Sequence, residues 1–208
     1  MGTAFDPERV RSAYDAVATP YAAAFGDELD RLPADAALVD RLGAHAGSAP
    51  ILELGAGVAP VARRLPAAYV VAADLAAGML AGAPPGTPCV QADARWLPFR
   101  DAAFGAACMR YVLQHLPRAA HGAAVGELRR VMSPGALLVV VVHLGDGEVE
   151  LTELLGHRFA PVGGTYHTRD EVHSLLAGRG FEIAEEHQRS PVAGEADTQR
   201  LSVLAIAA

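Results

Sequence analysis

ILELGAGVAP, residues 51–60, is the stretch that decides the fold of this 208-residue chain. A short apolar run from Ile51 to Leu54 meets the closely spaced glycines Gly55 and Gly57, and helix-forming residues 61–65 follow. The pattern predicts a buried strand, a tight turn and a helix. Glycine suits the turn because it accepts positive φ and lets a ligand approach the backbone. The helix N-terminus offers N–H groups and a positive dipole end, so we expect a nucleotide-type site at the first strand of a doubly wound sheet.

Two residues of this loop argue against a dinucleotide. Pro60 stands where the G-x-G-x-x-G fingerprint has its third glycine. Glu53 precedes the first glycine by two residues, and its charge would repel a pyrophosphate but would suit a cationic group. The pattern Glu53-x-Gly55-x-Gly57 resembles the first motif of the class I S-adenosylmethionine-dependent methyltransferases. That motif usually continues to a third glycine, where this chain has Ala59.

Length and composition limit the possible classes of protein. A chain of 208 residues with 51% hydrophobic residues fits one domain with a sizeable core. The net charge of −7 gives no electrostatic reason to bind nucleic acid or an anionic membrane. We see no apolar run long enough to span a membrane and no signal peptide in residues 1–11. Cys89 and Cys108 form no disulfide or metal spacing, so we interpret them as buried strand residues of a cytoplasmic protein.

Two further segments, residues 68–74 and 88–93, end in the acids Asp74 and Asp93. Asp74 lies seventeen residues beyond Gly57, close to the position at which nucleotide folds place a ribose-binding carboxylate. The alternative is that Asp74 caps a helix over residues 76–80, and both roles can hold. The methyltransferase resemblance implies that Leu75 and Met79 flank the adenine. It also implies that Asp93 accepts from the adenine amino group while the N–H of Ala94 reaches the ring.

The N-terminal segment is a predicted helix from about Asp6 to Thr19, and a second helix is expected near residues 35–46. Tyr14 and Tyr21 have two interpretations. They are half-buried residues of a surface helix, or they belong to a lid, since many related small-molecule methyltransferases have a similar Tyr-Asp-x-x-Ala-x-x-Tyr segment over the cofactor. We therefore predict an N-terminal helical lid region, residues 1–48, and one compact methyltransferase domain, residues 49–208.

The C-terminal half continues the resemblance. Residues 128–135, LRRVMSPG, resemble the junction of a helix with the fifth strand, and the apolar strand 136–143 follows. We expect a short helix over residues 151–155, irregular structure over 157–167, and a helix that begins at a capping box of Thr168 and Glu171. The last strands are expected near residues 181–186 and 201–207. The resemblance covers nearly the whole chain, from about Tyr14 to Ala207, and the chain is similar to small soluble methyltransferases that are common in actinobacteria.

The resemblance implies an α/β, Rossmann-like, doubly wound sheet of seven strands in the order 3-2-1-4-5-7-6, with the last strand antiparallel. Arg110 and Tyr111 stand at the end of the fourth strand, close to the transferable methyl group in relatives. His115 and His143 are the candidate catalytic bases, because both follow central strands. A base is needed only if the nucleophile arrives protonated. The predicted cofactor-binding residues are Tyr14, Tyr21, Glu53, Gly55, Ala56, Gly57, Asp74, Leu75, Met79, Asp93, Ala94, Arg110 and Tyr111.

The resemblance implies methyl transfer from S-adenosylmethionine to a small-molecule nucleophile, at oxygen or nitrogen, in secondary metabolism, with S-adenosylhomocysteine as product. Two alternatives remain open: a non-catalytic binding protein of the same fold, and an NAD-type oxidoreductase. We expect a small-molecule substrate, no nucleic acid or membrane partner, and a monomer or homodimer. No metal is expected, because His143, Asp146, His157 and His167 match no metal motif and are interpreted as solvated loop residues.

Overall fold

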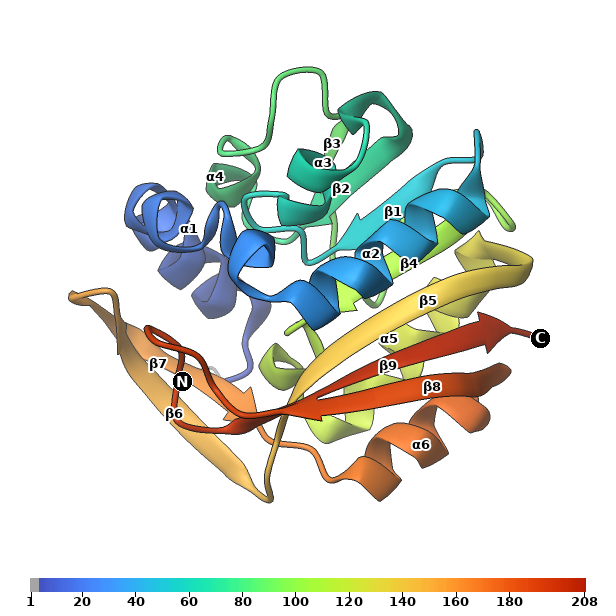
Figure 1. Ribbon diagram of the computed structural model, residues 1–208. Helices are drawn as coiled ribbons and strands as arrows, with labels where there is room; N and C mark the ends of the chain where they lie inside the picture. The colour runs from blue at the N-terminus through green and yellow to red at the C-terminus, as the bar shows by residue number, and fades with distance from the viewer. Residues whose placement is uncertain (1–3) are drawn as a thin grey trace.

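The computed structural model describes residues 4–208, which form a seven-stranded sheet in the order β3-β2-β1-β4-β5-β9-β8 (Figure 1). All neighbouring strands are parallel except that β9 is antiparallel to both β5 and β8. The strands are β1 (Ile51–Leu54), β2 (Val70–Asp74), β3 (Cys89–Gln91), β4 (Phe104–Arg110), β5 (Met132–Leu144), β8 (Phe181–Arg189) and β9 (Gln199–Ala207). Strands β6 and β7 lie outside this sheet, so β8 and β9 are its sixth and seventh strands. The predicted order and the antiparallel last strand are confirmed.

Helices cover both faces of the sheet because successive strand residues point to opposite sides. Leu52 and Leu54 pack in one cluster with α5 (Arg118–Val131) and α6 (Arg169–Ala177). Ile51 packs in another cluster with α2 (Pro33–Ala46) and α3 (Pro60–Arg64). The remaining helical elements are α1 (Pro7–Phe25), α4 (Ala77–Leu80) and the short 3₁₀ turns η1 (Glu28–Arg31), η2 (Ala67–Tyr69) and η3 (Leu113–His115).

Local signals set most helix boundaries. The predicted capping box of α6 is present, since Thr168 and Glu171 bond each other's backbone N–H. Helix α1 runs to Phe25 instead of ending at Thr19, although Pro20 removes one helical hydrogen bond. It continues because Tyr21 packs against a buried cluster formed by residues of α4 and the glycine loop.

A β-hairpin replaces two predicted elements. The short helix expected over residues 151–155 and the irregular structure over 157–167 are both wrong, because β6 (Glu148–Leu154) pairs with β7 (His157–Thr165). Leu155 and Gly156 connect the strands with φ of 51° and 79°, the two positive values that a type I′ hairpin turn requires. Gly163 was expected in a loop but lies within β7. The ring of Phe5 packs directly on it, in the space that a Cβ would occupy.

Helix α1 and the hairpin lie together beside the carboxyl edge of the parallel strands (Figure 1). The carboxylate of Asp15 accepts from the backbone N–H of Gly78 at 2.8 Å, which ties α1 to α4. Helix α2 packs instead against β4 and β5. Between residues 4 and 208, no helix is long and apolar enough to cross a membrane.

Candidate functional site

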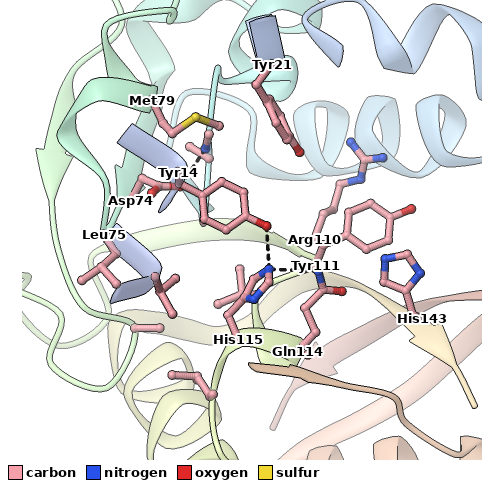
Figure 2. A pocket seen from close by; sticks show the side chains of 18 of the residues that line it. Tyr14, Tyr21, Asp74, Leu75, Met79, Arg110, Tyr111, Gln114, His115 and His143 are labelled. Carbon is pink, nitrogen blue, oxygen red and sulfur yellow. Dashed lines mark hydrogen bonds between the residues drawn. The ribbon is translucent and has the colours of Figure 1, made fainter. Parts of the chain in front are cut away.

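One cavity of about 600 Å³ opens at the carboxyl ends of the central strands (Figure 2). Its volume lies in the range of small-molecule and cofactor sites. Helix α1 and the β6–β7 hairpin form the wall opposite the sheet. Every residue that the sequence predicted for the site lines it: Tyr14, Tyr21, Glu53, Gly55, Ala56, Gly57, Asp74, Leu75, Met79, Asp93, Ala94, Arg110, Tyr111, His115 and His143.

The loop after β1 needs glycine for two reasons. Gly55 and Gly57 have φ of 65° and 54°, and a Cβ on Gly55 would lie 2.1 Å from Val112 Cγ2. Ala59, at the position of the third glycine, also has a positive φ of 57°. The left-handed conformation costs alanine about 1 kcal/mol. The loop therefore keeps a glycine-type backbone at Ala59 despite the methyl group.

Glu53 occupies the N-terminus of α3. Its Oε1 accepts from Val61 N at 2.9 Å and its Oε2 from Ala62 N at 3.2 Å. The prediction that these helix N–H groups are open to a ligand is therefore wrong, because the acid two residues before the first glycine already satisfies two of them. Burial raises the pKa of Glu53 to about 8, so the carboxyl is mostly neutral at pH 7.

Asp74 ties two turns together at the end of β2. Its Oδ2 accepts from Gly57 N and its Oδ1 from Ala76 N, both at 2.8 Å. Ala76 is itself the N-cap of α4, so the expectation that Asp74 caps this helix is wrong. Burial raises the pKa of Asp74. Each carboxylate oxygen keeps further lone-pair capacity for a ligand in the cavity.

Asp93 has a partner that the sequence analysis missed. Arg95 donates to its carboxylate from the backbone N and Nε, both at 2.9 Å, and from Nη2 at 2.5 Å. Partial burial raises the pKa of Asp93, but the bonds and charge of Arg95 outweigh it and lower the pKa. A ligand amino group would therefore share Asp93 with Arg95, and an arginine two residues after the acid was the available signal.

His115 lies where three segments meet. Its Nε2 is 2.7 Å from the hydroxyl of Tyr14 on α1 and 3.0 Å from the amide Nε2 of Gln114 (Figure 2). Its Nδ1 is 3.1 Å from the carbonyl oxygen of Gly163 on β7. Burial lowers the pKa of His115 to about 4, so the imidazole is neutral at pH 7. It can therefore accept a proton while it joins α1 to the hairpin.

A buried ion-pair network, which was not predicted from the sequence, reaches the wall of the cavity at Glu28 and Arg110. Arg110 pairs with Glu28 at 2.6 Å and with Asp35 at 3.6 Å. Arg189 also contacts Asp35, at 3.5 Å, and donates to the hydroxyl of Tyr111 at 3.2 Å. Tyr111 has a φ of 58°, a strained value for a bulky residue. The network fixes this side chain at the end of β4.

His143 and His167 have different environments from those expected of solvated loop residues. His143 lines the cavity, where its ring lies 4.9 Å from that of Tyr111. His167 is 1% exposed and its ring lies 5.0 Å from that of His121. The interpretation of both as solvated is wrong, because the β6–β7 hairpin and the end of β5 enclose them. Three or more possible metal ligands do not cluster anywhere in residues 4–208.

Sequence comparison identifies part of the chain. Residues 52–140 match the methyltransferase domain family. Over 93 residues the chain is 41% identical to the demethylmenaquinone methyltransferase of Mycolicibacterium vanbaalenii. The aligned stretch covers 43% of this chain and 40% of that protein. The corresponding protein of Mycobacterium tuberculosis strain H37Ra is also 41% identical over 93 residues, with 43% and 39% coverage. The chain thus spans about two fifths of the length of these curated relatives.

Structural comparison covers the chain more completely. The complex of DhpI with SAH has a TM-score of 0.71 and 24% identity, with 98% of each chain covered. The magnesium protoporphyrin IX methyltransferase of Synechocystis PCC 6803, with bound SAM, has a TM-score of 0.70 and 16% identity, with 100% of each chain covered. At these identities the likeness shows the fold alone.

Proposed function

We propose that this chain, of which residues 52–140 match the methyltransferase domain family, methylates a small molecule with S-adenosylmethionine. The product is S-adenosylhomocysteine, and oxygen or nitrogen is the accepting atom. The observation that carries the proposal is a single cavity that joins the glycine loop, the acid Asp74 and the neutral His115. Secondary metabolism is the proposed setting, in the cytoplasm, with a monomer or homodimer and without nucleic acid or membrane partners.

The residues around the glycine loop fit S-adenosylmethionine. A Cβ on Gly57 would lie 3.2 Å from Met79 Cε, so the glycine leaves free the space that a ligand needs between the loop and α4. The free lone pairs of Asp74 suit two ribose hydroxyls. Leu75 and Met79 offer apolar surfaces to the adenine, and the carboxylate of Asp93 suits its amino group.

The proposed reaction depends more on the position of the nucleophile relative to the methyl group than on general acid–base catalysis. The cofactor supplies a sulfonium methyl group whose transfer releases a neutral thioether, so no general acid is required. Tyr14 and Tyr21 on α1 exclude water from the cavity and present aromatic faces that attract a sulfonium. The Nε2 of His115 takes the proton of the nucleophile. A weak base with a pKa of about 4 suffices, because the nucleophilic atom becomes more acidic as it bonds to carbon.

The hairpin gives the acceptor side of the cavity an apolar surface. Val149, Leu151 and Leu154 of β6 line it, opposite the strand ends that carry Arg110 and His143. An acceptor with an apolar body and one polar, reactive end fits these two surfaces.

Cofactor titration followed by a transfer assay tests this proposal. We expect calorimetry to detect binding of S-adenosylhomocysteine and S-adenosylmethionine, with no binding of NAD as the comparison. A panel of phenols, hydroxy acids and amines is then incubated with deuterated-methyl S-adenosylmethionine, and labelled products are detected by mass spectrometry. Tight cofactor binding without a labelled product would favour the non-catalytic binding protein, and binding of NAD alone would contradict the proposal.

A further inference from the structure

The surroundings of His143 favour one of its two neutral tautomers. Its Nδ1 lies 2.7 Å from the hydroxyl oxygen of Thr198. That oxygen also accepts from Arg200 Nη1 at 2.8 Å, and a guanidinium can only donate. Within residues 4–208 the hydroxyl has no third partner, so its single hydrogen is free to point at Nδ1. The positive charge of Arg200 likewise favours a lone pair on that nitrogen.

His143 lines the cavity, and its second nitrogen, Nε2, is the one that Thr198 does not contact. In Figure 2 the ring of His143 lies across the cavity from Tyr14 and beside the ring of Tyr111. In the described part of the chain, Nε2 has no hydrogen-bond partner. Burial and the charge of Arg200 lower the pKa of His143 to about 4, so the ring is neutral. With the lone pair on Nδ1, the proton is on Nε2.

His115 has the opposite arrangement. Its Nδ1 faces the carbonyl oxygen of Gly163, which can only accept, so Nδ1 carries the proton. Its Nε2 therefore has the lone pair, which accepts from the hydroxyl of Tyr14 at 2.7 Å, with the amide nitrogen of Gln114 beside it at 3.0 Å. The hydroxyl of Tyr14, 2.7 Å from this nitrogen, occupies the place that a hydroxyl of the acceptor needs in order to lose its proton.

We infer that His115 and His143 hold opposite neutral tautomers, so that His115 accepts the proton of the nucleophile while His143 donates a hydrogen bond to a second atom of the acceptor. His143 is then a substrate-orienting residue and not an alternative base, and Thr198 is a positioning residue that acts through it. The atom that faces His143 must carry a lone pair. This inference rests on the proposed methyl transfer and narrows its substrate class to apolar acceptors with a hydroxyl or amine nucleophile and a separate carbonyl-type oxygen.

Nuclear magnetic resonance tests the tautomers without any substrate. Long-range proton–nitrogen spectra of the full chain with ¹⁵N-labelled histidine distinguish Nδ1–H from Nε2–H rings, and His115→Gln and His143→Gln variants assign the two signals. We expect Nδ1–H for His115 and Nε2–H for His143 at pH 7.5. Thr198→Val should move the Nδ1 chemical shift of His143, because the lone pair loses its hydrogen-bond donor, whereas Thr198→Ser should leave that shift unchanged. An Nδ1–H ring at His143 in the unmodified protein would overturn the inference.

Kinetics tests the donor role with pairs of phenols that differ only in an ortho carbonyl group. His143→Phe should lower kcat/KM about threefold to tenfold for the carbonyl compound, the loss expected for one neutral hydrogen bond, and about twofold or less for its partner. Equal losses for both compounds would refute the donor role. If the tautomers are as expected but the panel yields no methylated product, the proposed function fails and the role of His143 toward an acceptor fails with it.

Discussion

Replacement of Glu53 by glutamine gives a sharp test of the buried carboxyl beside the glycine loop. The side chain is 4% exposed, and its two oxygens accept from the first N–H groups of α3. Burial raises its pKa from 4.5 to about 8. Between these values the folded protein binds a proton that the unfolded chain has lost, so stability falls as pH rises. The contribution is fully present below pH 4.5 and is lost by about pH 8.

The magnitude follows from the slope of 1.36 kcal/mol per pH unit for one proton. From pH 5.5 to 7.5, Glu53 should cost the wild-type protein about 2.7 kcal/mol of unfolding free energy. Glu53→Gln has the same shape and does not ionise, so it should not show this loss. The difference in unfolding free energy between the two proteins should therefore change by about that amount, in favour of the variant as pH rises.

Urea denaturation followed by circular dichroism at several pH values measures this difference. Subtraction cancels the buried histidines, whose lowered pKa values destabilise both proteins equally in acid. The glutamine amide places an N–H₂ near Ala62 N, which adds a constant penalty without a pH dependence. A difference that stays flat from pH 5.5 to 7.5 would show that Glu53 is ionised in the folded protein, and the reasoning would be refuted.

Three further predictions concern the cofactor and the acceptor. Asp74→Ala should weaken S-adenosylhomocysteine binding by about 2–4 kcal/mol in calorimetry, since it removes a charged acceptor of two hydroxyl bonds; unchanged affinity in a folded variant would contradict the ribose role. His115→Ala should lower turnover about 10²–10⁴-fold with cofactor affinity nearly intact, whereas the matched variant Tyr14→Phe should stay within about tenfold of wild-type turnover; full activity of His115→Ala at neutral pH would make this histidine structural. Helix α1 should gain hydrogen-exchange protection when S-adenosylhomocysteine binds, and an unchanged exchange rate would argue against a lid.

The sequence by itself determined the sheet and the place of the site. Apolar runs that end in glycine or acid predicted the parallel strands, because strands buried on both faces read as continuous apolar segments. Since parallel strands present their carboxyl ends at one edge, residues as far apart as Gly55, Asp74 and His143 could be assigned to one cleft. The local capping box at Thr168 was likewise readable, because both partners lie within one turn of helix.

Contacts between distant segments were decided only by the tertiary structure. The local sequence of β7 contains glycines that are typical of a loop. The segment is nevertheless a strand, because it pairs with β6 and packs on α1. The partners of Arg110 come from Glu28 and Asp35, far away in the chain. A sequence pattern records the periodicity of neighbours along the chain, but hydrogen-bond partners depend on which elements meet in space. For the same reason the sequence could name His115 and His143 as equivalent bases, while only Gly163 and Thr198 beside them distinguish the acceptor from the donor.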